Sequence, residues 1–404
     1  MGLKIKIFGQ PIVNNNDPKY MEKLFEHGFD AAYSVIMASW NGSYAVVVED
    51  DNLIYAFTDP HGVEQLYYTT NKQTPEFSNV IKDLVDKADL DNQYISEVCK
   101  WGYNTDNRTP WNYIKRLLPG EVFIGDIYSK DVAFIKKFDG YFDEKSDIGD
   151  DAEELRNRLH KAVLTRVKML PEGTKTIAML LSGGLDSACV AYELLNLQKQ
   201  GELKDIEIKF YTINNSEDAP FVKIFAEKFG IDVNVLSYDM AEIDLKQALY
   251  INETPVDLGS MVPNQKMFEL IPETIIFTGD GPDEMLGGYN RMDQYDSQLS
   301  DTFEELPFYH FPRLNKAAIY YGKTLVCPYL DRSIVSLALQ VPLAERTHKK
   351  VLKTAYTGLI PDAIISRKKM PLKNDMLRAD PLGYRMMLIK EFKSIVTQPD
   401  NTEK

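Results

Sequence analysis

The sequence predicts an α+β N-terminal domain with layers of antiparallel sheet, followed by an α/β domain with a doubly wound parallel sheet and a helical C-terminal part. Three observations support this fold class in the 404 residues. Residues 1–140 alternate short strand patterns with turn residues. Residues 152–278 alternate strand patterns with helical ones, which is typical of a parallel sheet. Residues 290–404 are largely helical in pattern. We therefore expect two domains, 1–140 and 150–404.

The composition is that of an ordinary globular protein, with 44% hydrophobic and 26% charged residues. The net charge of −14 argues against binding to nucleic acid or to an anionic membrane. The three cysteines are widely spaced, which favours a reduced, cytoplasmic location over a disulfide framework or a metal cluster. No apolar run reaches membrane-spanning length, and the N-terminus lacks the pattern of a signal peptide. The sequence leaves open whether the protein forms a homodimer.

In the first domain, strands are expected where apolar runs end at turn residues such as Trp40-Asn41-Gly42 and Pro119-Gly120. The acidic segment from Tyr141 to Asp151 is poor in hydrophobic residues and is expected to be a linker. The expected strands are Lys4–Phe8, Ala32–Ala38, Tyr44–Glu49, Leu53–Thr58, Gln65–Thr69, Glu121–Asp126 and Val132–Lys136.

In the second domain, a helix over Ala152–Met169 precedes the strand–helix alternation. A ligand site is expected at the carboxyl ends of the strands, where doubly wound sheets bind their ligands. The expected strands are Thr176–Leu181, Ile206–Ile213, Asp232–Ser237 and Thr274–Thr278, with helices near 188–200, 219–229, 242–251 and 261–270.

The most informative segment is Ser182-Gly183-Gly184-Leu185-Asp186-Ser187, which follows a predicted strand and precedes a predicted helix. Two glycines allow a tight turn and a close ligand, and the N-terminus of a helix favours phosphate. The serine hydroxyls are donors for phosphate oxygens, and Asp186 is suited to hold a divalent cation. The lysine of a Gly-x-x-x-x-Gly-Lys-Ser/Thr loop is absent. A chance serine–glycine turn is the weaker interpretation, because all six residues suit a phosphate-binding loop and they stand between a predicted strand and a predicted helix.

A second loop, Thr278-Gly279-Asp280-Gly281-Pro282-Asp283-Glu284, follows another predicted strand. Because parallel strands end at the same edge of a sheet, both loops are expected there, with Asp186 and Asp283 sharing Mg²⁺. Asp280 is then expected to face the reacting carbonyl. Taken alone, this loop is equally compatible with an acidic, solvated turn.

These two loops resemble the ATP-binding and pyrophosphate-release loops of glutamine-hydrolysing asparagine synthetases, and of the β-lactam synthetases and lasso-peptide cyclases related to them. The resemblance covers roughly residues 150–375 and continues through Glu253-Thr254-Pro255, Pro328-Tyr329-Leu330-Asp331 and Ser366-Arg367-Lys368-Lys369. It implies an ATP-pyrophosphatase type of domain with ATP and Mg²⁺. The positions it implies for ATP are Leu181, Ser182, Gly183, Gly184, Leu185, Asp186, Ser187, Ile213, Thr278, Gly279, Gly281 and Lys369.

The same resemblance implies catalytic roles for Asp280 and Lys349. Cleavage of ATP at its α-phosphate develops negative charge, which a lysine aimed at that charge stabilises. Lys349 is the position that matches the family motif, although a shift of one residue would exchange it with Lys350. Without the two loops, a solvated helix face would explain Lys349, Lys350 and Lys353 about as well as a catalytic role does.

Residues 40–70 resemble the Ntn-type glutaminase domain of the same family, whose nucleophile is an N-terminal cysteine with its own amine as base. Here Gly2 stands at that place, and Cys99 is internal. We therefore expect a degenerate glutaminase domain without glutaminase activity. The nitrogen would come from ammonia or from an amine on a substrate.

The expected function is that of an ATP-dependent carbon–nitrogen ligase, which activates aspartate or a related small acid as an acyl-adenylate, with asparagine biosynthesis as the expected setting. An aspartate at position 280 leans towards an external amine, because the β-lactam-forming relatives carry tyrosine there. Against a plain asparagine synthetase, Gly322–Pro328 lacks the glutamate and arginine that usually stand there, and His310 replaces an expected acidic residue. His310 is suited to act as a base or to pack among aromatic rings. A synthetase that uses an amine on its own or a larger substrate, and a catalytically silent nucleotide-binding protein, remain the alternatives.

Overall fold

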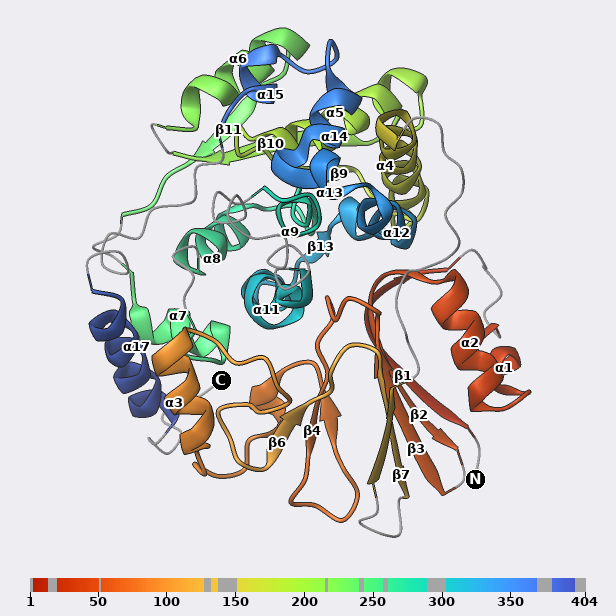
Figure 1. Ribbon diagram of the computed structural model, residues 1–404, viewed down its shortest axis with the longest axis vertical. Helices are drawn as coiled ribbons and strands as arrows, with labels where there is room; N and C mark the ends of the chain where they lie inside the picture. The colour runs from red at the N-terminus through yellow and green to blue at the C-terminus, as the bar shows by residue number, and fades with distance from the viewer. Residues whose placement is uncertain are drawn as a thin grey trace.

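The computed structural model describes residues 3–13, 20–50, 52–126, 132–136, 151–214, 217–239, 243–256, 261–288, 303–368 and 380–396. Within these residues, an antiparallel sheet and a parallel sheet lie at opposite ends of the molecule (Figure 1). Most of the expected linker, residues 141–150, falls outside the described residues. No described helix combines the length and apolarity needed to span a membrane.

The N-terminal sheet is antiparallel throughout, with strand order β1-β2-β3-β7-β8, as expected from its short strands and turns. A small sheet with order β5-β4-β6 lies beside it. The strands are β1 (Lys4–Ile12), β2 (Asn41–Asp50), β3 (Leu53–Thr58), β4 (Tyr67–Thr69), β5 (Phe77–Ser78), β6 (Ile114–Arg116), β7 (Glu121–Asp126) and β8 (Val132–Lys136).

The strand expected over Ala32–Ala38 is wrong, because these residues belong to helix α2 (Phe29–Ser39). The buried side chains recur with the period of a helix, at positions 29, 32, 33, 36 and 37. Phe29 stacks on Tyr55 of β3 with ring centres 4.1 Å apart, so the helix covers one face of the antiparallel sheet. α1 (Tyr20–Phe25) packs against α2.

The second sheet has the order β11-β10-β9-β12-β13, and every neighbouring pair is parallel. The chain first adds strands on one side of β9 and then on the other, so the strand order reverses between β9 and β12. Ligands bind at such a switch point, beyond the carboxyl ends of the strands. The strands are β9 (Thr176–Leu180), β10 (Glu207–Ile213), β11 (Val233–Leu236), β12 (Ile275–Phe277) and the unexpected β13 (Thr324–Val326).

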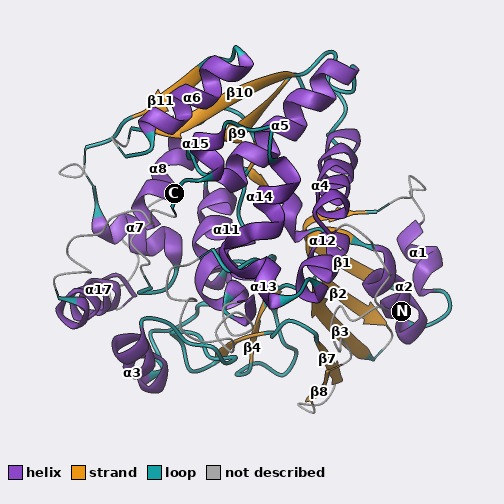
Figure 2. Cartoon of the chain, turned by 45° about the horizontal axis from the view of Figure 1, so that its top comes forward, coloured by secondary structure: helices purple, strands orange, loops and turns teal. Residues whose placement is uncertain are grey.

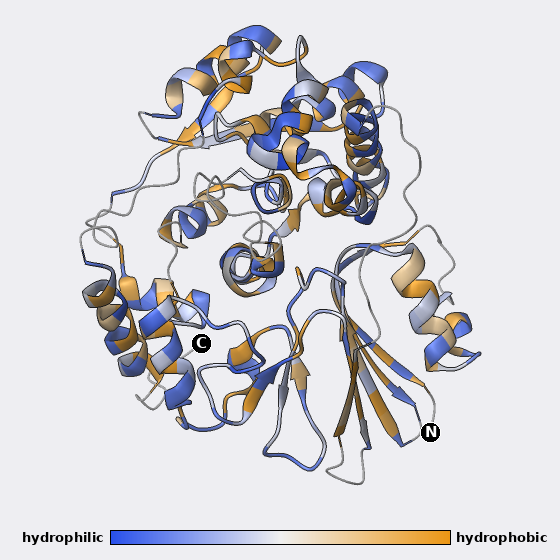
Figure 3. Ribbon diagram, in the orientation of Figure 1, coloured by the Kyte–Doolittle hydropathy of each residue, from blue (hydrophilic) through white to orange (hydrophobic). Residues whose placement is uncertain are grey.

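Helices cover both faces of this sheet, which confirms that it is doubly wound. Ile177 and Met179 of β9 face one core, with α4, α5, α6, α12 and α14, whereas Ala178 between them faces a second core, with α7, α8 and α11. These helices carry hydrophobic and hydrophilic residues together (Figure 3). They are α4 (Asp151–Lys168), α5 (Leu185–Gln200), α6 (Ala219–Phe229), α7 (Leu245–Asn252), α8 (Met261–Leu270), α11 (Phe311–Tyr320), α12 (Arg332–Gln340) and α14 (Lys350–Tyr356).

Helix α5 starts at Leu185, three positions before the helix expected from residue 188. This places Asp186 and Ser187 in its first turn. The remaining described helices include α3 (Asn92–Trp101), α9 (Pro282–Met285), α13 (Leu343–Arg346), α15 (Asp362–Ile365), α17 (Pro381–Val396) and the π-helix η4 (Leu306–His310).

The two parts of the chain share buried contacts. Helix α17 packs against both α3 of the first part and α7 of the second, as Figures 1 and 2 show. Trp111, Leu249 and Phe392 belong to one common core cluster. Glu253 accepts hydrogen bonds from the backbone N–H groups of Ile81 and Lys82, each at 3.0 Å. The parallel sheet is therefore held firmly against the N-terminal part.

Candidate active site

The first loop leaves β9 at Leu181 and enters α5 at Leu185, with Gly183 at a φ of +68°. A Cβ on Gly183 would lie 2.9 Å from the carbonyl oxygen of Asp218 and 3.0 Å from Nη1 of Arg367. The turn therefore requires glycine for both its backbone angle and its space. Its backbone N–H groups gather at the N-terminus of α5, which is the positive end of the helix dipole.

The hydroxyls of Ser182 and Ser187 brace this loop. Their oxygens lie 3.0 Å apart, and Ser187 Oγ also donates to the Gly184 carbonyl at 3.2 Å. The Ser182 N–H donates to Ser187 Oγ at 3.1 Å. Ser182 is exposed and Ser187 is buried. Of the two, Ser182 is therefore the hydroxyl open to a ligand, and Ser187 holds the turn.

The second loop leaves β12 at Thr278 and enters α9 at Pro282. Gly281 has a φ of +116°, a conformation that side chains other than glycine rarely adopt. Asp280 is half-buried, and its N–H lies 3.5 Å from Thr278 Oγ1. Asp283 is buried in the first turn of α9. The loop thus presents two aspartates from a short, sharply bent backbone.

The two loops touch, as expected for neighbouring strands at the switch point. A Cβ on Gly279 would lie 2.5 Å from the backbone nitrogen of Ser187 and 2.7 Å from the carbonyl carbon of Asp186. β9 and β12 are hydrogen-bonded neighbours. The structure therefore brings both loops to one edge of the parallel sheet.

Lys349 joins the two loops. Its Nζ lies 2.5 Å from Asp186 Oδ2 and forms an ion pair with Asp283 Oδ1. The lysine side chain is 8% exposed, while Lys350 beside it is exposed. A Cβ on Gly288 would clash with the Asp283 carboxylate and with Cε of Lys349. Of the two lysines left open by the sequence, Lys349 is the one that lies in the site.

The backbone that carries Lys349 is strained. Both His348 and Lys349 have a φ of 57°, in the left-handed region that non-glycine residues enter at a cost. Two hydrogen bonds hold them there, from His348 N to the Gly287 carbonyl and from Lys349 N to the Leu286 carbonyl, each at 2.9 Å. Strain held by surrounding contacts is typical of functional sites.

Arg367 closes the other side of the first loop. It pairs with Asp218, lies over the ring of Phe221 at 4.3 Å and donates to the Ser182 carbonyl at 3.4 Å. The sequence singled out Arg367 only as part of a basic segment, and it missed Asp218. Asp218 precedes α6 and Phe221 lies in its first turn. Their positions in the sequence do not indicate that they would contact the first loop.

His310 pairs with Glu284, the residue after Asp283. Its Nδ1 lies 3.4 Å from Glu284 Oε1, and both residues are buried. The sequence left two roles open for His310, a base or a contact among aromatic rings. The structure adds a third, an ion pair beside the second loop. His310 ends the π-helix η4, an element that occurs frequently at functional sites.

Two further positions were implied for the nucleotide, Ile213 and Lys369. Ile213 is the last residue of β10, the strand next to β9, and it is half-buried at the same edge. Lys369 falls outside the described residues. Lys353, one turn beyond Lys349, has a pKa lowered by burial and by the neighbouring charge of Lys349.

Two carboxylates, those of Asp186 and Asp283, share Lys349 as a partner where the loops meet. In the described part of the chain, no group of three or more histidine, cysteine, aspartate or glutamate side chains has the arrangement of a metal centre. Mg²⁺ is commonly held by one or two carboxylates together with substrate phosphates and water. Asp186 and Asp283 fit that mode of binding, and they do not fit a cage made of protein alone.

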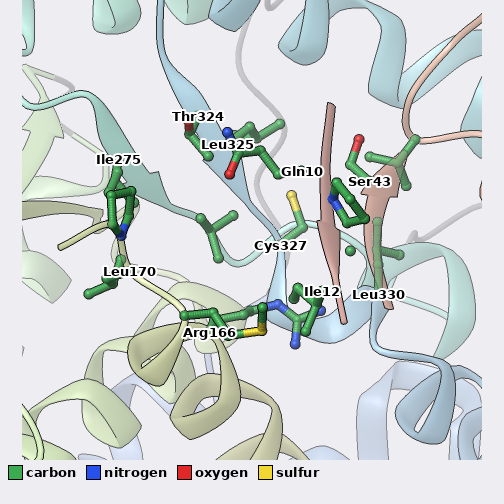
Figure 4. A pocket seen from close by; sticks show the side chains of 16 residues that line it. Gln10, Ile12, Ser43, Arg166, Leu170, Ile275, Thr324, Leu325, Cys327 and Leu330 are labelled. Atoms are coloured by element: carbon green, nitrogen blue, oxygen red, sulfur yellow. The ribbon is translucent and has the colours of Figure 1, made fainter. Parts of the chain in front are cut away.

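A cleft lies between the N-terminal sheet and the parallel sheet, with Ile12 and Ser43 on one side and Leu325 on the other (Figure 4). Cys327 and Leu330 line it and also contact the second loop. Cys327 Sγ lies 3.4 Å from Thr278 Oγ1. Burial, and then the charge of Asp280, raises the pKa of the Cys327 thiol to about 12, so it stays protonated and inert.

Residues 154–325 and 306–395 match the family model described as asparagine synthase. The chain belongs to the asparagine synthase family. This confirms the resemblance seen in its loops. Its match to the amidase chyE of Penicillium rubens is 23% identical, over 62% of this chain and 40% of that protein. Its match to the glutamine-hydrolyzing asparagine synthetase 1 of Bacillus subtilis is 22% identical, over 74% of this chain and 47% of that protein.

This chain spans about half the length of the curated relatives it matches. A putative glutamine-hydrolyzing asparagine synthetase 2 of Methanocaldococcus jannaschii is 24% identical over 72% of this chain and 57% of its own length. Among solved structures, a U34-tRNA thiolase from Methanococcus maripaludis matches 62% of this chain and 81% of its own at 14% identity, with a TM-score of 0.29. A score of that size carries no argument about the fold.

Proposed function

We propose that this member of the asparagine synthase family is an ATP-dependent ligase that joins a carboxylate to an amine and releases AMP and pyrophosphate. One observation carries the proposal: Lys349 lies between Asp186 and Asp283 where the loops after β9 and β12 touch. A cation held by two carboxylates at the switch point of a parallel sheet suits a polyphosphate and its metal.

The nucleotide binds along the first loop in this account. Its phosphates approach the backbone N–H groups at the N-terminus of α5 and the exposed hydroxyl of Ser182. Arg367, held by Asp218 and Phe221 beside Gly183, lies next to this path. The N-terminal helical turn and the arginine favour negative charge at the same place.

Asp186 and Asp283 would hold Mg²⁺ together with the phosphates of ATP. The ion would neutralise charge on the phosphates and orient them. The Lys349 ammonium offsets part of the negative charge of the two carboxylates. On arrival of the nucleotide, its positive charge is available to the departing pyrophosphate instead.

The reaction has two covalent steps. A carboxylate oxygen of the acid attacks the α-phosphorus, the bond to the β-phosphate oxygen breaks, and pyrophosphate leaves. The amine nitrogen then attacks the acyl carbon, the carbon–oxygen bond to AMP breaks, and the amine loses a proton. Asp280, half-buried at the bend of the second loop, is the proposed acceptor of that proton. Adenylation is needed because oxide is a poor leaving group and AMP is a good one.

The nitrogen donor is proposed to be ammonia or an amine, without hydrolysis of glutamine. Cys99 lies inside helix α3, and Cys189 and Cys327 are buried in the second part, so these thiols do not offer the N-terminal nucleophile of a glutaminase. Gly2, the position implied for that nucleophile, falls outside the described residues. Glutamate released from glutamine in step with ATP use would contradict this part.

A second candidate is an amide-forming synthetase whose amine belongs to the substrate or to a larger molecule. It is favoured by the relatives, which include proteins named amidases as well as asparagine synthetases. Aspartate or a related small acid remains the first acceptor to test. A catalytically silent nucleotide-binding protein is the third candidate, and the ion triad of Lys349 with Asp186 and Asp283 argues against it.

The test measures pyrophosphate release from ATP and Mg²⁺ with a pool of small carboxylic acids, with and without ammonium. Acid-dependent release that ammonium accelerates supports the first candidate. Acid-dependent release that ammonium leaves unchanged supports a substrate amine. Binding of ATP without pyrophosphate release under every condition supports the silent protein and overturns the ligase.

A further inference from the structure

The buried carboxylate of Glu193 lies on helix α5, the helix that carries Asp186, further along from the site. Glu193 of α5 follows Asp186 by two helical turns, and its side chain is 2% exposed. Its Oε1 accepts a hydrogen bond from the Tyr356 hydroxyl at 2.8 Å. Its Oε2 lies 2.7 Å from His160 Nδ1 of α4. The proposed chemistry uses none of these three residues.

Tyr356 follows Lys349 by seven residues, about two helical turns, just as Glu193 follows Asp186. Tyr356 ends α14, two turns beyond Lys349, which caps the start of that helix. Helices α5 and α14 are therefore joined twice, at the site by Lys349 with Asp186 and two turns below by Tyr356 with Glu193. The two bonds together fix the rotation of α14 about its axis.

The placement of α14 determines where Lys349 lies. Lys349 caps the start of α14, so a helix that turned or shifted would carry the Lys349 ammonium away from the two aspartates. The left-handed backbone at His348 and Lys349 costs energy and persists only while neighbouring contacts hold it. A bond at the far end of α14 supplies such a contact.

The Tyr356 hydroxyl is well suited to this bond. The ring is fully buried, with Tyr192 at 5.9 Å between ring centres. Burial, and then the Glu193 carboxylate, raises the pKa of Tyr356 well above its usual value. The hydroxyl therefore keeps its proton and donates it. A buried carboxylate is costly unless it is hydrogen-bonded, so loss of this donor disturbs the pair of helices.

We propose that Glu193 and Tyr356 are positioning residues that lock α14 onto α5 and so hold the Lys349 ammonium between Asp186 and Asp283. The inference rests on the proposed function for its effect on catalysis, since neither residue touches the site. The lock itself is a property of the protein without ligand.

The lock is tested by acetylating surface lysines with acetic anhydride and measuring the modification of Lys349 relative to Lys350 by mass spectrometry. The variant Tyr356→Phe removes one oxygen from a buried ring. Tyr113→Phe is the matched control, since the Tyr113 hydroxyl is hydrogen-bonded at Asp86 and Lys87 in the N-terminal part. We expect the ratio to rise about fivefold or more in Tyr356→Phe, as when a buried hydrogen bond is lost, and to stay at the wild-type value in the control.

A second variant separates hydrogen bonding from charge. Glu193→Gln keeps an oxygen that accepts from Tyr356, and we expect it to retain most of the protection of Lys349. For pyrophosphate release, we expect Tyr356→Phe to lower kcat by about tenfold to a hundredfold, as misplacement of a catalytic group does, with KM for ATP within about twofold.

Equal labelling ratios and equal kcat values in Tyr356→Phe and Tyr113→Phe would overturn the lock. A wild-type protein that releases no pyrophosphate, but whose Lys349 loses protection in Tyr356→Phe, would overturn the proposed function and leave the lock standing.

Discussion

Gly279 and Ser187 lie closer together than any side chain at position 279 would permit, since a Cβ there would be 2.5 Å from the Ser187 backbone nitrogen. The contact joins the loop after β12 to the first turn of α5. It fixes the distance between the aspartates that each loop contributes. The site therefore depends on backbone packing as much as on its charged side chains.

The first prediction concerns this contact. Gly279→Ala places a methyl group against backbone atoms that have no freedom to rotate away, so we expect the free energy of unfolding to fall by about 1 to 3 kcal/mol. Gly184→Ala is the control for folding, because its Cβ would meet nothing closer than 3.4 Å. Urea denaturation measures both. Equal stability of the two variants would show that the loops are not packed as described.

The second prediction distinguishes the two lysines. Lys349→Met removes the charge between Asp186 and Asp283, and we expect the rate of pyrophosphate release to fall by about 10² to 10³, the effect of losing one electrostatic contact in a transition state. Lys350→Met alters an exposed side chain, and we expect a change within about twofold. Equal losses in the two variants would contradict the assignment of Lys349.

The third prediction concerns a buried ion pair in the second part of the chain, whose carboxylate also binds the first part. Lys316 pairs with Glu253, and both side chains are at most 5% exposed. Glu253→Gln leaves the Lys316 ammonium buried without its counter-charge, and we expect a loss of about 3 to 5 kcal/mol in unfolding free energy.

Glu76→Gln is the control for the Glu253 variant, because Glu76 pairs with Lys72 at the surface. We expect a change within about 1 kcal/mol there. Replacing both Glu253 and Lys316 by neutral residues is expected to restore part of the loss. A Glu253→Gln protein as stable as Glu76→Gln would show that the buried ion pair of Glu253 with Lys316 does not stabilise the fold.

The fourth prediction is a pH dependence. Burial, and then the charge of Arg332, lowers the pKa of His61 from 6.5 to about 3. The unfolded chain therefore binds a proton that the folded protein excludes, and stability present above pH 6.5 is lost as the pH falls towards 3. At pH 5.5 this single group lowers the unfolding free energy by about 1.4 kcal/mol relative to neutral pH.

The pH effect is isolated by comparing the wild type with His61→Gln at pH 7.5 and 5.5. The difference in unfolding free energy between the two proteins should shrink on acidification by about the amount of that single-group effect. An unchanged difference would show that His61 titrates normally in the folded state.

Much of the second part of the chain was predictable because its strands and glycine loops are local patterns. The loops after β9 and β12 carry their own turn residues, and the rule for parallel sheets places them at one edge. Strand β13 was missed because it has three residues, too few for a pattern of its own. The helix over Phe29–Ser39 was missed because Tyr33, Val35 and Ile36 are residue types that are common in strands.

The candidate site was predictable only where a residue lies in a motif. Asp186, Asp283 and Lys349 stand in such motifs, and the structure brings them together. Asp218 and Phe221 at Arg367, and Glu284 at His310, meet through tertiary packing between segments far apart in the chain. No local pattern in one sequence records such contacts.

The central claim is that a carboxylate of the substrate becomes joined to the α-phosphorus of ATP. It is tested most directly by incubating the protein with ATP, Mg²⁺, ammonium and a pool of small acids labelled with ¹⁸O in their carboxylates, and by measuring the mass of the AMP formed. The account predicts one ¹⁸O atom in the phosphate of AMP, because the acyl carbon–oxygen bond breaks when the amine attacks. AMP without the label, or ADP and inorganic phosphate as the products, would contradict it.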